Sequence, residues 1–213
     1  KGERIVKKKL LSMLVSFMMI FNLFTPFASY AEETTETDPQ ENYIVFDVEK
    51  FILGLGYVQE PIMVPIYEGQ TGAEVVISVL GEKNVSYTGS LTSSFYLSRM
   101  VDEDDTEIDG YSKGRTKDGW LGEFDYTQFS GWMYCVNSTF PNVGMSSYNP
   151  KSGDVMRVQF TATGYGADVG GGFGTSAKVA NKDKLTTALA NINSASNKNK
   201  LLSYSKRRPL PKP

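Results

Sequence analysis

Hydrophobic and polar residues alternate in short runs between residues 43 and 161, which is the spacing of β-strands with one buried face. In residues 43–49 every second residue is large and apolar, so this run predicts a first strand. Residues 62–67 predict a second strand at a sheet edge or a bulge, because Pro65 cannot donate a ladder hydrogen bond. Three later runs predict returning strands, at 95–101, 131–137 and 154–161.

One helix is predicted between the second and third strands. Thr71 and Glu74 have the S/T-x-x-E spacing of a capping box, in which each side chain bonds the other residue's main-chain amide. Residues 75–80 give an apolar helical face, and Gly81 is expected to be a left-handed C-cap. Two strands, a helix and returning strands predict the α+β class. We expect a β-grasp-like (ubiquitin-like) mixed sheet with one main packed helix.

The N-terminal 31 residues have the pattern of a secretory signal peptide. Basic residues at positions 4 and 7–9 precede a largely apolar run at 10–24, and Ser29 and Ala31 suit signal peptidase. The apolar run is shorter than the roughly 20 residues of a membrane-spanning helix. An uncleaved N-terminal anchor is the alternative, and it is the only membrane contact we expect. The pattern predicts a secreted or cell-surface protein. A single cysteine fits export by a Gram-positive bacterium, because exported proteins of such bacteria often lack disulfides.

Beyond the strands the composition changes twice. Six glycines occur in residues 164–174, which predicts a flexible exit from the domain. Leu185, Leu189 and Ile192 then have i, i+4, i+7 spacing, which predicts a short amphipathic helix. Alone it is too short to be stable, so we expect it to dock or to begin a further module. The chain therefore divides into a signal peptide (1–31), an acidic disordered linker (32–41), a folded domain (42–169), a Gly-rich linker (170–177), an amphipathic helix (178–195) and a basic disordered tail (196–213).

The composition excludes much enzyme chemistry. The 213 residues include no histidine and one cysteine, so the Ser-His-Asp and Cys-His nucleophilic systems and histidine-ligated metals are excluded. Residues 32–174 hold eight basic and 22 acidic residues, a net charge of −14 that disfavours binding to a phosphate backbone. We expect a non-enzymatic protein that binds no nucleic acid and is a monomer.

Three spaced segments carry a family resemblance. They are Phe129-Ser-Gly-Trp-Met-Tyr-Cys-Val-Asn137, Gly144-Met-Ser-Ser-Tyr148 and Lys151-Ser-Gly-Asp-Val155. Together they are similar to a bacterial secreted domain of uncharacterised function, which itself resembles the C-terminal domain of transcobalamin and intrinsic factor. The resemblance covers about residues 43–169, and Ser138 departs from it where the family often has glycine. It implies a β-grasp-like domain that, in the vertebrate proteins, closes over one face of cobalamin.

The candidate ligand site is aromatic. Trp132 and Tyr134 share one face of a predicted strand, and with Phe140 and Tyr148 they give an aromatic shelf for a flat ligand. The alternative is that these rings belong to the core of the sheet. A shelf that binds cobalamin or another corrinoid would act by shape, ring packing and main-chain hydrogen bonds, since no histidine is present to ligate cobalt. We therefore expect a ligand-binding module, and the alternative is a structural or adhesive surface module with protein or glycan contacts.

Other candidate chemistry is weaker in the sequence. Asp105, Glu107 and Asp109 begin like a calcium-binding loop, but its twelfth position is Thr116 instead of glutamate. We predict no metal site here, with a weak extracellular calcium site as the alternative. The carboxylates of this stretch and of residues 118–125 leave an acid-based hydrolase as a third, disfavoured hypothesis. One further residue, Cys135, lies in an apolar run and is expected to be a buried small hydrophobe.

Overall fold

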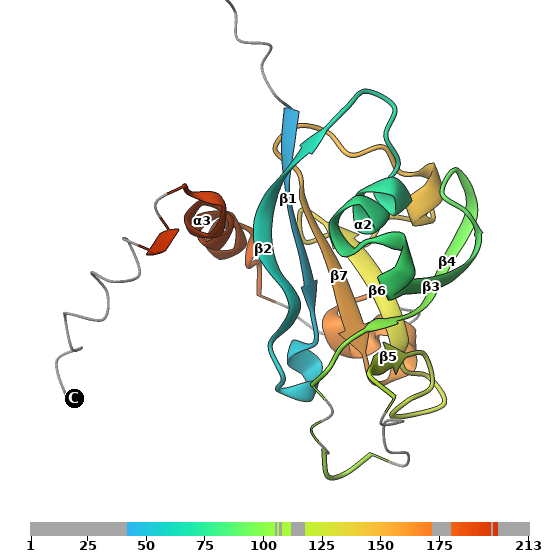
Figure 1. Cartoon of the computed structure of the whole chain (residues 1–213). Coiled ribbons are helices and arrows are strands. Elements are labelled where there is room, and N and C mark those ends of the chain that lie inside the picture. The colour runs from blue at the N-terminus through green and yellow to red at the C-terminus, as the bar shows by residue number, and fades with distance from the viewer. Residues whose placement is uncertain are drawn as a thin grey trace, which may run out of the picture. The chain divides into compact units, whose positions relative to one another are not determined.

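The computed structural model describes residues 42–104, 106, 108–111, 118–171, 180–196 and 198–199. They form a mixed α+β structure with two α-helices and two β-sheets, which confirms the predicted class (Figure 1). The predicted signal peptide and acidic linker lie outside these ranges. Among the residues described, no helix has the length and apolar character needed to cross a membrane.

The main sheet has the strand order β2-β1-β7-β6. Its central pair, β1 (Asn42–Glu49) and β7 (Val155–Thr161), is parallel. The outer strands, β2 (Tyr57–Ile66) and β6 (Gly131–Val136), run antiparallel to their neighbours. Parallel pairs are typical of sheets covered on both faces, and nearly every residue of the central pair is buried. The first and last strands of the domain thus form the middle of the sheet.

The strand β2 lies at the edge of the sheet, as Pro65 predicts. It begins at Tyr57, well before the predicted start at Ile62. The alternating pattern fails in this first part because the pairing with β1 shifts register twice, between Phe46 and Glu49. Each shift changes which side chains face the core, so the local sequence shows no clean period of two.

The predicted helix is present as α2 (Gly72–Leu80). The Thr71 hydroxyl accepts from the Glu74 amide at 3.2 Å, and the Glu74 carboxylate accepts from the Thr71 amide at 2.7 Å, which confirms the capping box. The inner valines of the helix are fully buried in the main hydrophobic core. The prediction for Gly81 is wrong in detail, because its φ of 81° is positive but its ψ of 135° is not that of a left-handed helix.

A second, antiparallel sheet has the order β3-β4-β5. The predicted strand at 95–101 is β4 (Ser93–Val101). The sequence pattern does not predict β3 (Val85–Ser90) or β5 (Trp120–Gly122). The former is mostly polar and the latter has three residues, so neither contains a run long enough to show a period.

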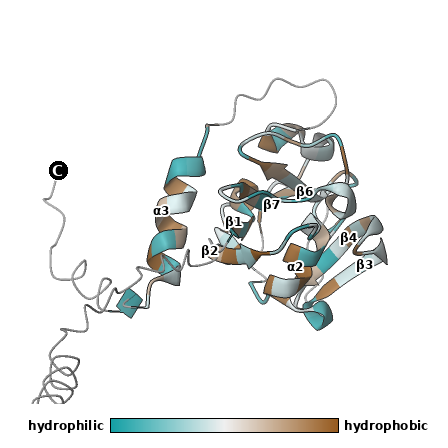
Figure 2. Ribbon diagram, turned by 90° about the horizontal axis from the view of Figure 1, so that it is seen from above, coloured by the Kyte–Doolittle hydropathy of each residue, from teal (hydrophilic) through white to brown (hydrophobic). Residues whose placement is uncertain are grey.

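The C-terminal helix α3 (Asp183–Ser194) packs on the main sheet through an unexpected face. Thr186 and Ala190 are buried, whereas Leu185 is 62% exposed and Ile192 is 39% exposed. The helix is docked, but of its predicted apolar face only Leu189 is half-buried, while the two residues on either side of it are exposed. The sheet surface beneath α3 combines a small apolar cluster, in which Val45 and Val155 contact Ala190, with buried charges of β1 and β7. Small and polar helix side chains fit such a surface better than large apolar ones. In Figure 2, α3 stands apart from α2, beside β2.

The glycine-rich segment after β7 begins with a defined turn. Residues Gly164–Val169 (η4) form 3₁₀ turns interrupted by a kink at Tyr165 and Gly166, and Asp168 accepts from the amides of Ala162 and Thr163 at 2.8 and 3.0 Å. Residues 172–179 lie outside the described residues, and with them most of the predicted linker and the first two positions of the predicted helix at 178–195.

Removing the Thr71 hydroxyl tests the cap of α2. We expect Thr71→Ala to lower the free energy of unfolding by about 1–2 kcal/mol, because the hydroxyl accepts from Glu74 and also donates to the Leu91 carbonyl at 2.7 Å. Thr71→Ser keeps both hydrogen bonds and should lose less than half as much. Urea unfolding of the full chain, followed by circular dichroism, measures both variants. Equal losses contradict the role given to the hydroxyl.

Candidate functional site

An aromatic groove with a volume of about 230 Å³ lies between the two sheets. One wall is formed by residues 95–97 of β4, and the other by residues 132–134 of β6. The rest of its lining comes from residues 140–141 and 143–145, which follow β6 in the chain. Three of the four predicted site residues line this aromatic groove, namely Trp132, Tyr134 and Phe140.

Trp132 packs between the two largest hydrophobic clusters. Its indole Nε1 donates to the Leu121 carbonyl of β5 at 3.2 Å, and its ring meets Phe160 of β7 edge-to-face with centroids 5.0 Å apart. These contacts hold the ring across the junction of the two sheets. Trp132 is therefore a core residue that also lines the groove.

Tyr134 and Tyr148 are tied together behind the groove. Tyr134 is 9% exposed, its hydroxyl donates to the Val143 carbonyl at 2.5 Å, and its ring lies 6.1 Å from that of Tyr148. The Tyr148 hydroxyl donates to Asp154 at 2.7 Å. Burial raises the pKa of Tyr134 to about 12, and burial together with the Asp154 bond raises the pKa of Tyr148. Both phenols stay neutral, and Tyr148 supports the groove wall without lining the groove.

A second cavity adjoins the groove at Met133, Phe140 and Pro141, which line both. We call it the hollow. Its volume is about 760 Å³, within the range of about 300–1,000 Å³ that is typical of small-molecule sites. Tyr165 and two glycines contribute to its lining. The Phe140 ring is thus accessible from two cavities at once, and it is the predicted site residue with the least part in the core.

Phe140 is the one predicted site residue among those that line the hollow, and two of the others, Tyr165 and Gly171, shape it most clearly. Tyr165 is 59% exposed, has a φ of 52° that side chains rarely adopt, and stacks edge-to-face on Phe129 at 5.1 Å. A Cβ atom at Gly171 would lie 2.9 Å from the Phe140 ring, so this close approach of the main chain requires glycine. The sequence feature that could have indicated Tyr165 is its position between two glycines. The high glycine content of residues 164–174 predicted a linker instead.

A tight turn positions Phe140. Asn137 and Ser138 both have positive φ, 50° and 60°, and the main chains of Val136 and Thr139 bond each other at 2.8 and 2.9 Å. These φ signs are those of a type I′ hairpin turn, so the turn forms although serine stands where the similar family often has glycine. The Ser138 hydroxyl donates to a carboxylate of α3 at 2.9 Å.

The other face of the main sheet carries a charged layer, formed by Asp47 and Glu49 of β1, Arg157 and Gln159 of β7, and Lys182 before α3. Arg157 pairs with a carboxylate of α3, and Glu49 accepts from Gln159 and, at 2.6 Å, from Lys182. Asp47 is fully buried and has no hydrogen-bond partner among the described residues. Burial, followed by the nearby Glu49 charge, raises the pKa of Asp47 to about 8, and the two cations of the layer oppose this only in part.

Cys135 borders the charged layer and is buried, as predicted. Burial raises the pKa of its thiol to about 11, although Nη1 of Arg157 lies 3.6 Å from the sulfur. The cation comes from the neighbouring strand, so residues close in the sequence do not reveal it. A buried thiol that stays protonated is not a nucleophile.

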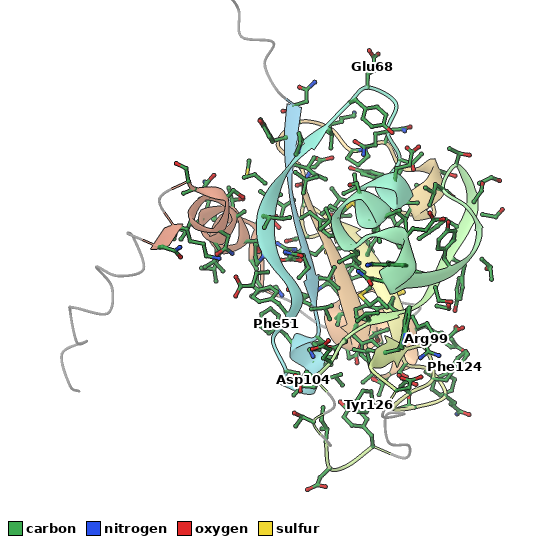
Figure 3. The ribbon with its side chains drawn as sticks, viewed as in Figure 1. Phe51, Glu68, Arg99, Asp104, Phe124 and Tyr126 are labelled. Atoms are coloured by element: carbon green, nitrogen blue, oxygen red, sulfur yellow. The ribbon has the colours of Figure 1, made fainter. Side chains whose placement is uncertain are left out.

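The acidic stretch after β4 contributes to a buried ion pair. Lys50 is 1% exposed and donates to Asp102 at 2.8 Å and to Asp104 at 3.0 Å. Asp104 lies near Phe51, at the end of β1 (Figure 3). Within the described residues, no three His, Cys, Asp or Glu side chains are grouped so that they could hold a metal ion. Positions 105, 107 and 116 of the predicted calcium loop lie outside those residues.

The carboxylates of Asp118, Glu123 and Asp125 gather with Arg99 around a cavity of about 220 Å³ beside β5. Asp118 pairs with Arg99, which lowers the pKa of that carboxyl, and Glu123 accepts from the Tyr96 hydroxyl. A glycosidase needs one carboxylic acid that keeps its proton near neutral pH. The ion-paired Asp118 does not meet this need, so the arrangement gives no support to the hydrolase hypothesis.

Truncating Trp132 measures its share in the core. We expect Trp132→Ala to lower the free energy of unfolding by roughly 3 kcal/mol, because the ring fills the junction of two clusters and bonds Leu121. Phe129→Ala removes a more exposed aromatic ring and serves as the matched control. Scanning calorimetry of the full chain measures both. A loss no larger than that of the control contradicts the core role.

Replacing Asp47 tests the buried charge. The folded state holds this proton up to about pH 8, whereas an unfolded aspartate with its usual pKa of 3.8 releases it, so stability falls as the pH rises through that window. Asp47→Asn removes the titration. We expect its free energy of unfolding to exceed that of the parent by several kcal/mol at pH 8–9 and to match it near pH 4. Urea unfolding across this range measures the difference, and parallel pH profiles contradict the expectation.

The comparisons with known proteins concern the same part of the chain. A family model described as a domain of unknown function (DUF4430) matches residues 104–162. A comparison with curated proteins found no match. The family match supports the resemblance to a domain of uncharacterised function, and the likeness to transcobalamin and intrinsic factor stays a prediction. The chain is thus similar to this family across the stretch that contributes β6, the turn after it and Phe140.

Proposed function

We propose that this chain is an exported, non-enzymatic ligand-binding module whose ligand contacts the rim shared by the groove and the hollow. The observation that carries the proposal is Phe140, whose ring lines both cavities and follows a tight turn that positions it. Largely apolar and aromatic walls with few polar groups are the usual lining of small-molecule sites. Support for export comes from the pattern of the first 31 residues.

The fold proposed for this module is β-grasp-like. Support comes from a first hairpin, β1 and β2, followed by α2, and from the final strand β7 lying parallel to β1 in the centre of the sheet. The second sheet is an addition to that arrangement and supplies the β4 wall of the groove. A fold alone does not specify a ligand, so the ligand is argued from the cavities.

A corrinoid such as cobalamin is the candidate ligand, on the basis of the sequence resemblance. At about 230 Å³ the groove is smaller than the roughly 300–1,000 Å³ of sites that enclose a small molecule. A large flat ligand would therefore rest on the rim, with one edge in the groove and another in the hollow. The chain has no histidine, so it would hold such a ligand by packing and hydrogen bonds and not through the metal.

The alternative function is a structural or adhesive surface module. It is favoured by the outward face of α3, where Leu185 and Ile192 are exposed although the helix is docked. Neighbouring apolar side chains on an exposed face are typical of contact surfaces. A module that works through this face would need neither the groove nor the hollow. Binding to a protein or glycan that depends on α3 and not on Phe140 would support the alternative.

Calorimetric titration of the full chain with cyanocobalamin and cobinamide tests the corrinoid proposal. We expect saturable binding that weakens about tenfold in Phe140→Ala, because this ring offers contact area to a ligand in either cavity. Tyr67→Ala is the matched control, since Tyr67 is an exposed aromatic residue just after β2 and lines neither cavity. No heat from folded protein removes corrinoids as ligands, and equal affinity in Phe140→Ala places the site elsewhere.

A further inference from the structure

The strand β6 is an outer strand of the main sheet, and β7 is its ladder partner. Just past the end of the ladder, the Asn137 amide donates to the Val155 carbonyl at 3.0 Å, and the Val155 amide donates to the side-chain oxygen of Asn137 at 2.9 Å, so the Asn137 amide points toward β7. Main-chain groups alternate in direction along a strand, so the N–H and C=O groups of Trp132 and Tyr134 point away from β7. Val136 is the next residue whose main-chain groups should point away from β7. Its amide does so, because it donates to the Thr139 carbonyl at 2.8 Å.

Four main-chain groups along the groove therefore point away from β7, and we call them the open groups. Within the part of the chain that the structure describes, the amides and carbonyls of Trp132 and Tyr134 bond no other residue. On the opposite wall, the Phe95 amide is already bonded, to the Ser146 hydroxyl at 3.2 Å. The β6 side of the groove thus offers alternating donors and acceptors next to apolar side chains.

We propose that this open edge of β6 binds an extended peptide segment, which adds to the main sheet as a further strand and places one large apolar side chain in the aromatic groove. The inference rests on the ligand-binding function proposed above. It names a peptide as the class of ligand that binds at this edge. A peptide main chain supplies matching donors and acceptors at the strand repeat of about 7 Å. An apolar ligand without amides would displace water from the four open groups and leave them unpaired.

The cavities specify the side chains of such a peptide. Alternate residues of a strand point to the same face, so a groove of about 230 Å³ receives one side chain. The neighbouring cavity of Asp118, Glu123, Asp125 and Arg99 adjoins the groove at Tyr96, which lines the groove and donates to Glu123. Glu123 lies beside the groove at this point, so a basic residue close to the apolar one is favoured.

Amide hydrogen exchange on the isotope-labelled full chain, followed by NMR, tests the strand addition. The probe is an equimolar mixture of peptides acetyl-Lys-Thr-Z-Thr-Lys-amide, in which Z is Leu, Ile, Phe, Tyr or Trp. We expect the mixture at millimolar concentration to slow exchange of the Trp132 and Tyr134 amides at least about tenfold. The amides of Met133 and Cys135 point toward β7 and should not change.

Two controls separate main-chain pairing from other contacts. The same peptides with N-methylated amides keep their side chains and lose their donors, so they should protect neither residue. Glu123→Gln should reduce the protection several-fold, whereas Glu60→Gln, the same change on the opposite edge strand, should not. Unchanged exchange of Trp132 and Tyr134 in the unmethylated mixture overturns the proposal, and so does equal protection by the methylated one.

The same spectra distinguish a failure of this inference from a failure of the proposed function. Suppose that cyanocobalamin shifts the Met133 methyl and Phe140 ring signals while the peptides protect neither amide. The ligand-binding function then stands and the strand addition is overturned. If neither probe changes any signal from the groove or the hollow, both are overturned.

Discussion

The pairing of β1 with β7 is the constraint on which the rest of the structure depends. Because the two strands run parallel in a fixed register, their alternate residues give the main sheet one apolar face and one face on which charged residues lie next to Val45 and Val155. Ile44 and Phe46 lie in the core with α2, whereas Asp47, Glu49 and Arg157 lie on the side of α3. A slip of one residue would bury these charges against the valines of α2, so a single register specifies both layers.

The same register reaches the groove through β6. Trp132 pairs with Phe160 and Tyr134 with Val158, so both aromatic side chains are directed to the apolar face by residues of β7 that are themselves core. These are also the pairs whose main-chain groups turn away from the partner strand in an antiparallel ladder. The aromatic side chains and the open main-chain groups therefore occur at the same two residues. Strand geometry alone therefore places the aromatic side chains and the open main-chain groups at the same residues.

Sequence patterns predicted the features that neighbouring residues decide. The cap at Thr71 and the edge position of Pro65 are confirmed because each depends on main-chain groups a few residues away. The face through which α3 docks was not predicted, because it depends on Val45, Glu49 and Arg157, which belong to strands far earlier in the chain. The hydropathy pattern of a helix does not show which kind of surface the helix packs against. Tyr165 was missed for the same reason, since its place in the hollow is set by tertiary contacts and its sequence context is that of a linker.

Stability and binding share residues on β6 and separate after it. Trp132 and Tyr134 cannot change without cost to the core, so the edge that they present is as constant as the fold itself. Phe140 and Val143 follow a turn and line the groove from outside the sheet, where substitution disturbs the core less, whereas Met145 belongs to the core. A ligand that uses the edge of β6 must therefore conform to the geometry of a strand. Its affinity would come from main-chain hydrogen bonds, and the residues of the rim would determine which ligand side chains are preferred.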